Sequence, residues 1–326
     1  MGVIIVIALG FDFTNGFHDA ANAIATTIST RALSPRRALA MSAVMNLAGA
    51  FLTTAVATTV GKGIVQTTAI SLALVGAALI GAIIWNLATW RLGLPSSSSH
   101  ALIGGLVGAM LAARGLNFVQ WANIWHKVIE PALVSPLAGF VLGFLIMLAL
   151  YWLFHSWMPA KVNRTFRRLQ VGSAAFVSFS HGANDAQKTM GVITLALVAG
   201  HDQTRFVVPP WVILLSATAI ALGTYSGGWR IIRTMGQRII RLEPINGFAA
   251  ETASASILLT SSLLGLPVST TQVVSSAVVG VGSARNTGAV RWGVAGSIVI
   301  AWLLTLPAAA AAGALTFEGL RLFGAS

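Results

Sequence analysis

Acidic, amide and basic side chains occur together at two places inside strongly apolar stretches of the sequence. Asp19 and Asn22 lie three residues apart in the segment NGFHDAANA, so in a helix they face the same side. The segment HGANDAQKT presents a second set, formed by Asn184, Asp185 and Lys188. An ionised side chain among apolar neighbours is costly unless it is paired or binds a ligand, so both segments are candidates for a cation or proton site. A helix cap or an interhelical hydrogen bond is the structural alternative.

Each of two prolines is followed by a run of hydroxyl side chains. Pro95 begins the segment PSSSSH and Pro267 begins the segment PVSTTQ, and both runs enter stretches rich in apolar and small residues, 101–113 and 273–284. A proline suits a helix start because it has no N–H to leave unpaired. The hydroxyl groups would then lie at a helix N-terminus, where free N–H groups and the helix dipole favour an anion. N-capping with back-bonding is the structural alternative, but the symmetric pair favours an oxyanion site.

Other polar residues in apolar surroundings support weaker hypotheses. Asp12 and Glu251 could each carry a proton, or each could be a structural partner for a hydroxyl or an arginine, and we favour the structural role. The six histidines show no metal-ligand spacing such as HExxH, and the chain has no cysteine. The sequence therefore predicts no cofactor and no certain metal site, and it shows no oriented Ser-His-Asp set typical of a hydrolase.

Long apolar runs must form the elements that hold these residues. Hydrophobic residues make up 56% of the 326 residues and charged residues only 9%, against about 25% charged in soluble domains. Several runs approach the roughly 20 residues that span a bilayer, for example 67–90 and 132–154. The chain is therefore predicted to be an all-α integral membrane protein. Its net charge of +12 does not indicate nucleic-acid binding, because the basic residues cluster in loops at 31–37, 158–168 and 229–242.

The polar segments and the proline runs belong to an internal repeat, with matching residues 166 and 172 positions apart. Basic loops in one half have weakly charged counterparts in the other, so by the positive-inside rule equivalent spans run in opposite directions. We therefore expect two inverted-topology repeats, residues 1–157 and 169–326, with about 10–12 transmembrane segments in all. Two re-entrant helical hairpins are placed near 93–113 and 265–284, the basic linker 158–168 in the cytoplasm, and the N-terminus outside.

With these motifs the chain resembles the inorganic phosphate transporter (Pit) family over essentially its whole length. That family carries a G-A-N-D-type signature in each half and two Pro-x-Ser/Thr hairpins. The resemblance implies that phosphate is held between the hairpin tips and that the Asp/Asn motifs handle the coupling cation. The implied phosphate ligands are Ser97, Ser98, Ser99, Ser269, Thr270 and Thr271, with Lys188 adding a positive charge. The implied coupling residues are Asp19, Asn22, Asn184 and Asp185.

Two departures from the family pattern bear on the coupling ion. Phe17 and His18 stand where the family's sodium-coupled members usually have Ala-Asn, and Lys188 stands where they have Asn. This variant resembles the bacterial, proton-coupled branch. The expected function is therefore a proton-coupled phosphate symporter of the inner or plasma membrane that works by alternating access.

Several alternatives stay open. Sodium could be the coupling cation, with Asp19, Asn22 and Asp185 as its ligands, or another tetrahedral oxyanion such as sulfate could be the substrate. An intramembrane hydrolase fits less well because the second half has Gln272 in place of His100, and an ion channel fits less well because inverted halves suit alternating access. The expected partners are inorganic phosphate, a proton or a sodium ion, and the lipid bilayer, and a homodimer stays open.

Overall fold

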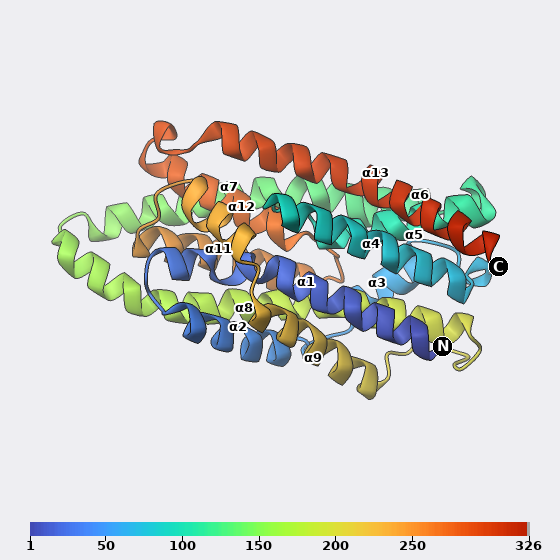
Figure 1. Ribbon diagram of the computed structural model, residues 1–326. Helices are drawn as coiled ribbons and strands as arrows, with labels where there is room; N and C mark the ends of the chain where they lie inside the picture. Colours follow the sequence, from blue (N-terminus) through green and yellow to red (C-terminus); the bar gives the residue numbers. More distant parts are fainter. Residues whose placement is uncertain (325–326) are drawn as a thin grey trace.

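The computed structural model describes residues 1–324, and helices joined by loops and short turns make up this part of the chain (Figure 1). The first half contains α1 (Gly2–Ser29), α2 (Pro35–Gly49), α3 (Ala55–Gly63), α4 (Leu72–Leu92) and α5 (Ser98–Arg114). α6 (Trp121–Ile124) continues through one π-helical turn into α7 (Glu130–Phe154). The second half contains α8 (Pro159–Ala199), α9 (Pro210–Ser226), α10 (Trp229–Arg233), α11 (Pro244–Leu263), α12 (Thr270–Arg285) and α13 (Trp292–Leu322). The predicted all-α class is confirmed.

Proline and glycine set several of the helix boundaries. Pro159 occupies the first turn of α8 and Pro244 the first turn of α11, where a missing N–H costs nothing. Gly93 follows α4 with a φ of 67°, and Gly265 lies between α11 and α12 with a φ of 69°. Both angles fall in the left-handed region that glycine adopts without strain. The chain therefore turns back at the same point of each predicted hairpin.

Length and composition identify the membrane-crossing elements. Within residues 1–324, four helices are long and apolar enough to cross a membrane, namely α1, α4, the continuous α6–α7 and α13, and α9 with the bent segment that follows it would make a fifth. The expectation of about 10–12 segments counted shorter or more polar stretches as well. α5 and α12 have only 17 and 16 residues, and α8 carries buried polar side chains along its middle. These helices contribute most of their buried side chains to the interior of the bundle.

Helices recur in the same order in the two halves. α4, α5 and α6 begin 172, 172 and 171 residues before α11, α12 and α13, which supports the proposed division into two repeats. Figure 1 shows both termini at one end of the bundle and the α7–α8 connection at the other. The turn between α1 and α2 lies away from the termini as well, so two of the predicted cytoplasmic loops point the same way.

Each half covers the hairpin helix of the other half. α5 packs against α13, and α12 packs against α7. Glycine makes this close approach feasible, because a Cβ added at Gly108 would overlap the carbonyl oxygen of Ala310, and one added at Gly280 would overlap that of Phe140. This exchange ties the halves together and fixes the N-terminal ends of α5 and α12 beside α1 and α8.

Candidate functional site

α1 and α8 bring the two polar motifs together in the interior of the bundle. Asp19 on α1 and His181 and Asp185 on α8 are buried, and one ligand atom from each lies within 4.8 Å of the others. The two helices run antiparallel, because Thr30 on α1 bonds to the earlier α8 residue Gln170 at 2.7 Å. Two motifs that lie 166 residues apart in the sequence therefore form a single centre.

The carboxylate of Asp19 contacts the second hairpin. Thr271, in the first turn of α12, donates its hydroxyl to Asp19 Oδ1 at 3.3 Å, and the amide of Asn22 donates to the same hydroxyl at 2.8 Å. The ring of His18 lies on the other side, with Nδ1 at 2.8 Å from Asp19 Oδ1. Asp19 and Asn22 thus hold the N-terminal end of α12 against α1.

The carboxylate of Asp185 contacts the same hairpin and also a buried ammonium. Thr270 donates its hydroxyl to Asp185 Oδ1 at 3.0 Å, and Lys188 Nζ lies 2.5 Å from the same oxygen. The Lys188 ammonium also donates to the hydroxyl of Ser99 and, at 3.2 Å, to the carbonyl of Val268. Lys188 therefore links Asp185 to the tips of both hairpins.

The hairpin hydroxyls are buried, and several of them are free to donate a hydrogen bond. Ser97 and Ser269 are the N-cap residues of α5 and α12, and each side-chain oxygen accepts a hydrogen bond from the backbone of its own helix. A hydroxyl that accepts in this way keeps its own proton free to donate. Ser98 Oγ is buried and has no hydrogen-bond partner within residues 1–324. The two helix ends thus offer hydroxyl and N–H donors in one dry place, which is the chemistry that an oxyanion requires.

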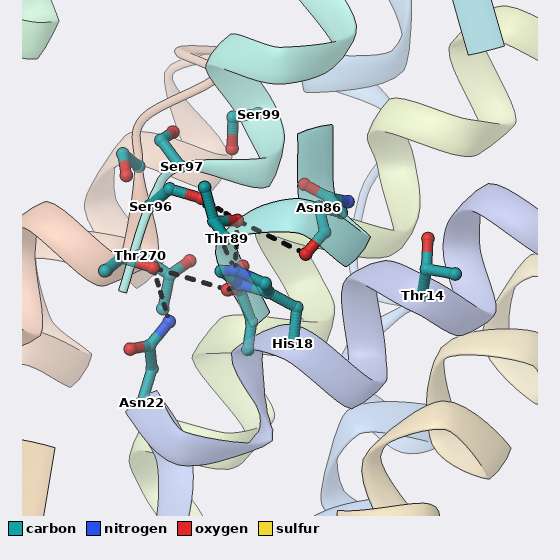
Figure 2. Close-up of polar contacts among 12 residues, drawn as sticks. Thr14, His18, Asn22, Asn86, Thr89, Ser96, Ser97, Ser99 and Thr270 are labelled. Carbon is teal, nitrogen blue, oxygen red and sulfur yellow. Dashed lines mark hydrogen bonds and ion pairs between the residues drawn. The ribbon is translucent and has the colours of Figure 1, made fainter. Parts of the chain in front are cut away.

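A chain of polar side chains continues from Asp19 to the base of the first hairpin (Figure 2). His18 Nε2 lies 3.2 Å from Thr89 Oγ1 and 3.4 Å from Ser96 Oγ, and these two hydroxyls are 2.8 Å apart. Figure 2 shows Ser96 and Ser97 above Thr270 and Asn22, which places elements of both halves around the same centre. The centre thereby connects the two hairpins through α1.

Asn184, which was predicted as a coupling residue, contacts the second hairpin. Its amide donates to the hydroxyl of Ser262 and to the carbonyl of Leu266, both at 3.2 Å. These acceptors lie at the end of α11 and in the loop that leads to α12. In this geometry Asn184 fastens the second hairpin to α8, while its side-chain oxygen stays without a partner in the described chain.

Comparison with known families matches residues 15–313 to the phosphate transporter family. The chain belongs to this family. A probable low-affinity inorganic phosphate transporter from Mycobacterium bovis (strain ATCC BAA-935 / AF2122/97) is 52% identical over 99% of this chain and 78% of its own length. A protein of the same description from Bacillus subtilis (strain 168) is 46% identical over 98% and 97%. A solved structure, described as the sodium-dependent phosphate transporter, matches with a TM-score of 0.90 and 30% identity, covering 98% of this chain and 99% of that chain.

As a member of the phosphate transporter family with several apolar membrane-crossing helices, the protein is a multi-pass protein of the cell membrane. The predicted resemblance is confirmed. Its relatives are described as transporters and permeases rather than as enzymes. This is consistent with the prediction that a hydrolase fits the sequence less well.

Sequence reasoning did not place His18 and His181 among the candidate site residues, although both flank the carboxylates of this phosphate transporter family member. His181 Nε2 lies 3.3 Å from Asp185 Oδ2, and His181 Nδ1 lies 2.7 Å from the side-chain oxygen of Asn46. His18 is adjacent to Asp19 in the sequence, and His181 precedes Asp185 by one helical turn. The spacing of His181 and Asp185 could have revealed this contact, because residues four apart share a helix face.

Glu251 has the structural surroundings that we favoured for it. Its carboxylate accepts hydrogen bonds from Thr26 at 2.6 Å, Thr27 at 2.8 Å, Gln170 at 2.9 Å and Ser173 at 2.5 Å. These donors lie on α1 and α8, so Glu251 on α11 joins three helices below the carboxylate centre. A buried carboxylate with four donors is satisfied without any ligand.

Proposed function

We propose that this protein is a secondary active symporter that imports inorganic phosphate together with protons by alternating access. The proposal builds on membership of the phosphate transporter family. One observation carries it further: hydroxyls from the tip of one hairpin donate to both buried carboxylates, and Lys188 connects Asp185 to the other tip. The proposed ligands of the anion and the proposed ligands of the cation or proton are therefore in direct contact.

Phosphate in this proposal lies between the N-terminal ends of α5 and α12. Ser97, Ser98, Ser99, Ser269, Thr270 and Thr271 would replace its water shell, together with the free N–H groups of both helix ends. Lys188 would contribute one positive charge as a point donor. All seven side chains are at most 2% exposed, so the anion would be bound in a dry site where each donor counts strongly.

Coupling follows from shared donors. Thr270 and Thr271 now donate to Asp185 and Asp19, so the same hydroxyls cannot also donate to phosphate. A protonated carboxyl group is a weaker acceptor and releases the hydroxyl that it held. Proton binding therefore strengthens phosphate binding, and by linkage phosphate binding strengthens proton binding.

Lys188 favours a proton over sodium in this scheme. Its ammonium is surrounded by a carboxylate oxygen of Asp185, the hydroxyl of Ser99 and the carbonyl of Val268. Oxygen ligands of these kinds, at unwound helix ends, coordinate sodium in secondary transporters. In this chain a tethered cation takes that position, so the second carboxylate is already neutralised without sodium.

Sodium coupling is the second candidate, and a specific observation favours it. The Asp19, His181 and Asp185 group brings two carboxylates and an imidazole within 4.8 Å, a spacing at which one ion could be shared. The solved relative is described as sodium-dependent. We place this candidate behind the proton, because histidine is not among the oxygen ligands that sodium prefers.

Uptake by the purified protein in sealed liposomes tests the proposal. We expect radiolabelled phosphate to accumulate in sodium-free buffer when the outside is more acidic than the lumen, and to stop accumulating when a protonophore dissipates the gradient. Excess arsenate should compete as a phosphate mimic, whereas excess sulfate should compete poorly because it carries no proton to share with an aspartate. Uptake that strictly requires sodium and ignores the pH gradient would contradict proton coupling.

A further inference from the structure

Asp12 is a buried carboxylate that lies outside the Asp19–Asp185 centre and the hairpin tips. It lies on α1 seven residues before Asp19, which is two helical turns or about 10 Å closer to the end of the bundle that carries both termini (Figure 1). Asp12 is 0% exposed, and neither carboxylate oxygen has a hydrogen-bond partner within residues 1–324.

The polar neighbours of Asp12 come from α1 and α8. Asn15 on α1 and Thr189 on α8 are polar side chains that lie beside the carboxylate. The charged groups of Asp185 and Lys188 are also close enough to interact with it. Asn15 and Thr189 are 0% exposed, and their polar side-chain atoms also have no partner in the described chain. One carboxylate, one amide and one hydroxyl are thus neighbours in the interior, and none of their polar atoms makes a hydrogen bond of ordinary geometry within residues 1–324. Oxygen atoms of these three kinds are the preferred ligands of small hard cations.

A comparison with Glu251 separates a structural carboxylate from a binding one. Glu251 is equally buried, but four side chains donate to it, so its charge is compensated inside the fold. Asp12 has no such donors. A carboxylate that is buried without donors is strongly unfavourable as a bare anion, so its stable forms carry a proton or a bound cation.

We infer that Asp12, together with Asn15 and Thr189, forms a second site for the coupling cation, outward of the Asp19–Asp185 centre. The inference rests on the proposed symport function. Because α1 and α8 run antiparallel, Asp12 faces Thr189 one helical turn beyond Asp185 on the same pair of helices that carries the centre. A cation taken up at Asp12 is therefore close to the two carboxylates whose hydroxyl donors would also serve phosphate. By the charge of the loops, this is the outer side of the protein.

Replacing Asp12 by asparagine tests the inference, because the change keeps the shape and removes the charge. Two transport modes are measured in sealed liposomes: accumulation driven by a cation gradient, and exchange of internal for external phosphate at equal pH and equal sodium. We expect Asp12→Asn to lower gradient-driven accumulation at least about tenfold, the loss typical of one charged ligand, while exchange stays near wild type. Asp202→Asn removes an exposed acidic residue in the α8–α9 loop and should leave both modes unchanged.

Thr189→Val is the second variant, and it decides the matter if Asp12→Asn does not fold. It removes a hydroxyl that can donate to the ionised carboxylate and keeps the carboxylate itself, so it should lower the external proton concentration needed for half-maximal accumulation without lowering exchange. Wild-type accumulation in both variants would overturn the Asp12 site. An equal loss of both modes in a folded variant would overturn it too, because that result indicates a structural role.

The same experiment separates this inference from the proposed coupling ion. Wild-type accumulation that follows a sodium gradient and not a pH gradient would refute proton coupling. The Asp12 site would then be tested by the dependence of phosphate accumulation on sodium. A weaker dependence in Asp12→Asn would support the site, and an unchanged dependence would overturn it.

Discussion

Replacing Lys188 by asparagine is the perturbation that most sharply probes the coupling scheme. Lys188 Nζ lies 2.5 Å from Asp185 Oδ1, and both side chains are at most 1% exposed. Removing one partner of a buried pair costs ~3–5 kcal/mol, because the other charge stays buried without compensation. His181 at 3.3 Å and Thr270 at 3.0 Å remain beside Asp185, so we expect the lower end, about 3 kcal/mol, or roughly a hundredfold in an equilibrium constant.

Thermal unfolding in detergent measures this cost, and an exposed ion pair supplies the control. Arg285 and Glu243 form a pair at 3.1 Å whose side chains are 60% and 45% exposed, so Arg285→Gln should change stability by less than ~1 kcal/mol. The double variant Lys188→Asn, Asp185→Asn removes both buried charges and should recover most of the lost stability without recovering proton-driven uptake.

Sodium provides the second measurement on the Lys188 variant. Without the ammonium, the oxygens of Asp185, Ser99 and Val268 are free to hold a small cation. Sodium should then raise the unfolding temperature of Lys188→Asn and not that of the wild type, because a ligand that binds only the folded state stabilises it. A loss of stability no larger than that of Arg285→Gln, together with no response to sodium, would refute the reasoning.

Three further predictions concern the hairpins, the topology and the inner carboxylate. Ser98→Ala and Thr270→Ala should each weaken phosphate uptake, by the ~1.5–3 kcal/mol typical of a hydrogen bond to a charged group, and the double variant should nearly abolish it, as measured by uptake in liposomes at matched protein content. Single cysteines at Ser34 and Thr204, both exposed in a chain without native cysteine, should differ toward an impermeant thiol reagent added outside, with only position 204 labelled, and equal labelling would exclude the inverted arrangement. Glu251→Ala should lower the unfolding temperature, because four donors lose their acceptor, and an unchanged unfolding temperature would argue against its structural role.

The fold class and the family followed from local patterns in the sequence. Long apolar runs with few charges predict membrane helices wherever they occur, and the two hydroxyl runs after Pro95 and Pro267 mark the starts of α5 and α12 within three residues. The number of membrane-crossing helices was harder to predict. α5, α12 and the middle of α8 are buried among other helices, so neither their length nor their polarity has to match the bilayer.

The contacts of the candidate site could not be predicted, because they join the two halves of the chain. Asp19 meets Thr271, and Lys188 meets Ser99, only because α1 and α8 cross antiparallel and each hairpin is held by the other half. No periodicity in the sequence encodes that crossing. The same limit explains why Asp12 and Glu251 looked alike in the sequence: both are single carboxylates among apolar residues, and only the packed structure shows that one has four donors and the other has none.

Proton movement driven by phosphate tests the central claim most directly. Sealed liposomes that hold the purified protein and a pH-sensitive dye are given an inward phosphate gradient at equal pH in sodium-free buffer. Symport with protons predicts that the lumen becomes acidic as phosphate enters, and that Asp19→Asn, Asp185→Asn liposomes show neither uptake nor acidification. A lumen whose pH stays unchanged without sodium, while phosphate enters only after sodium is added, would contradict the account.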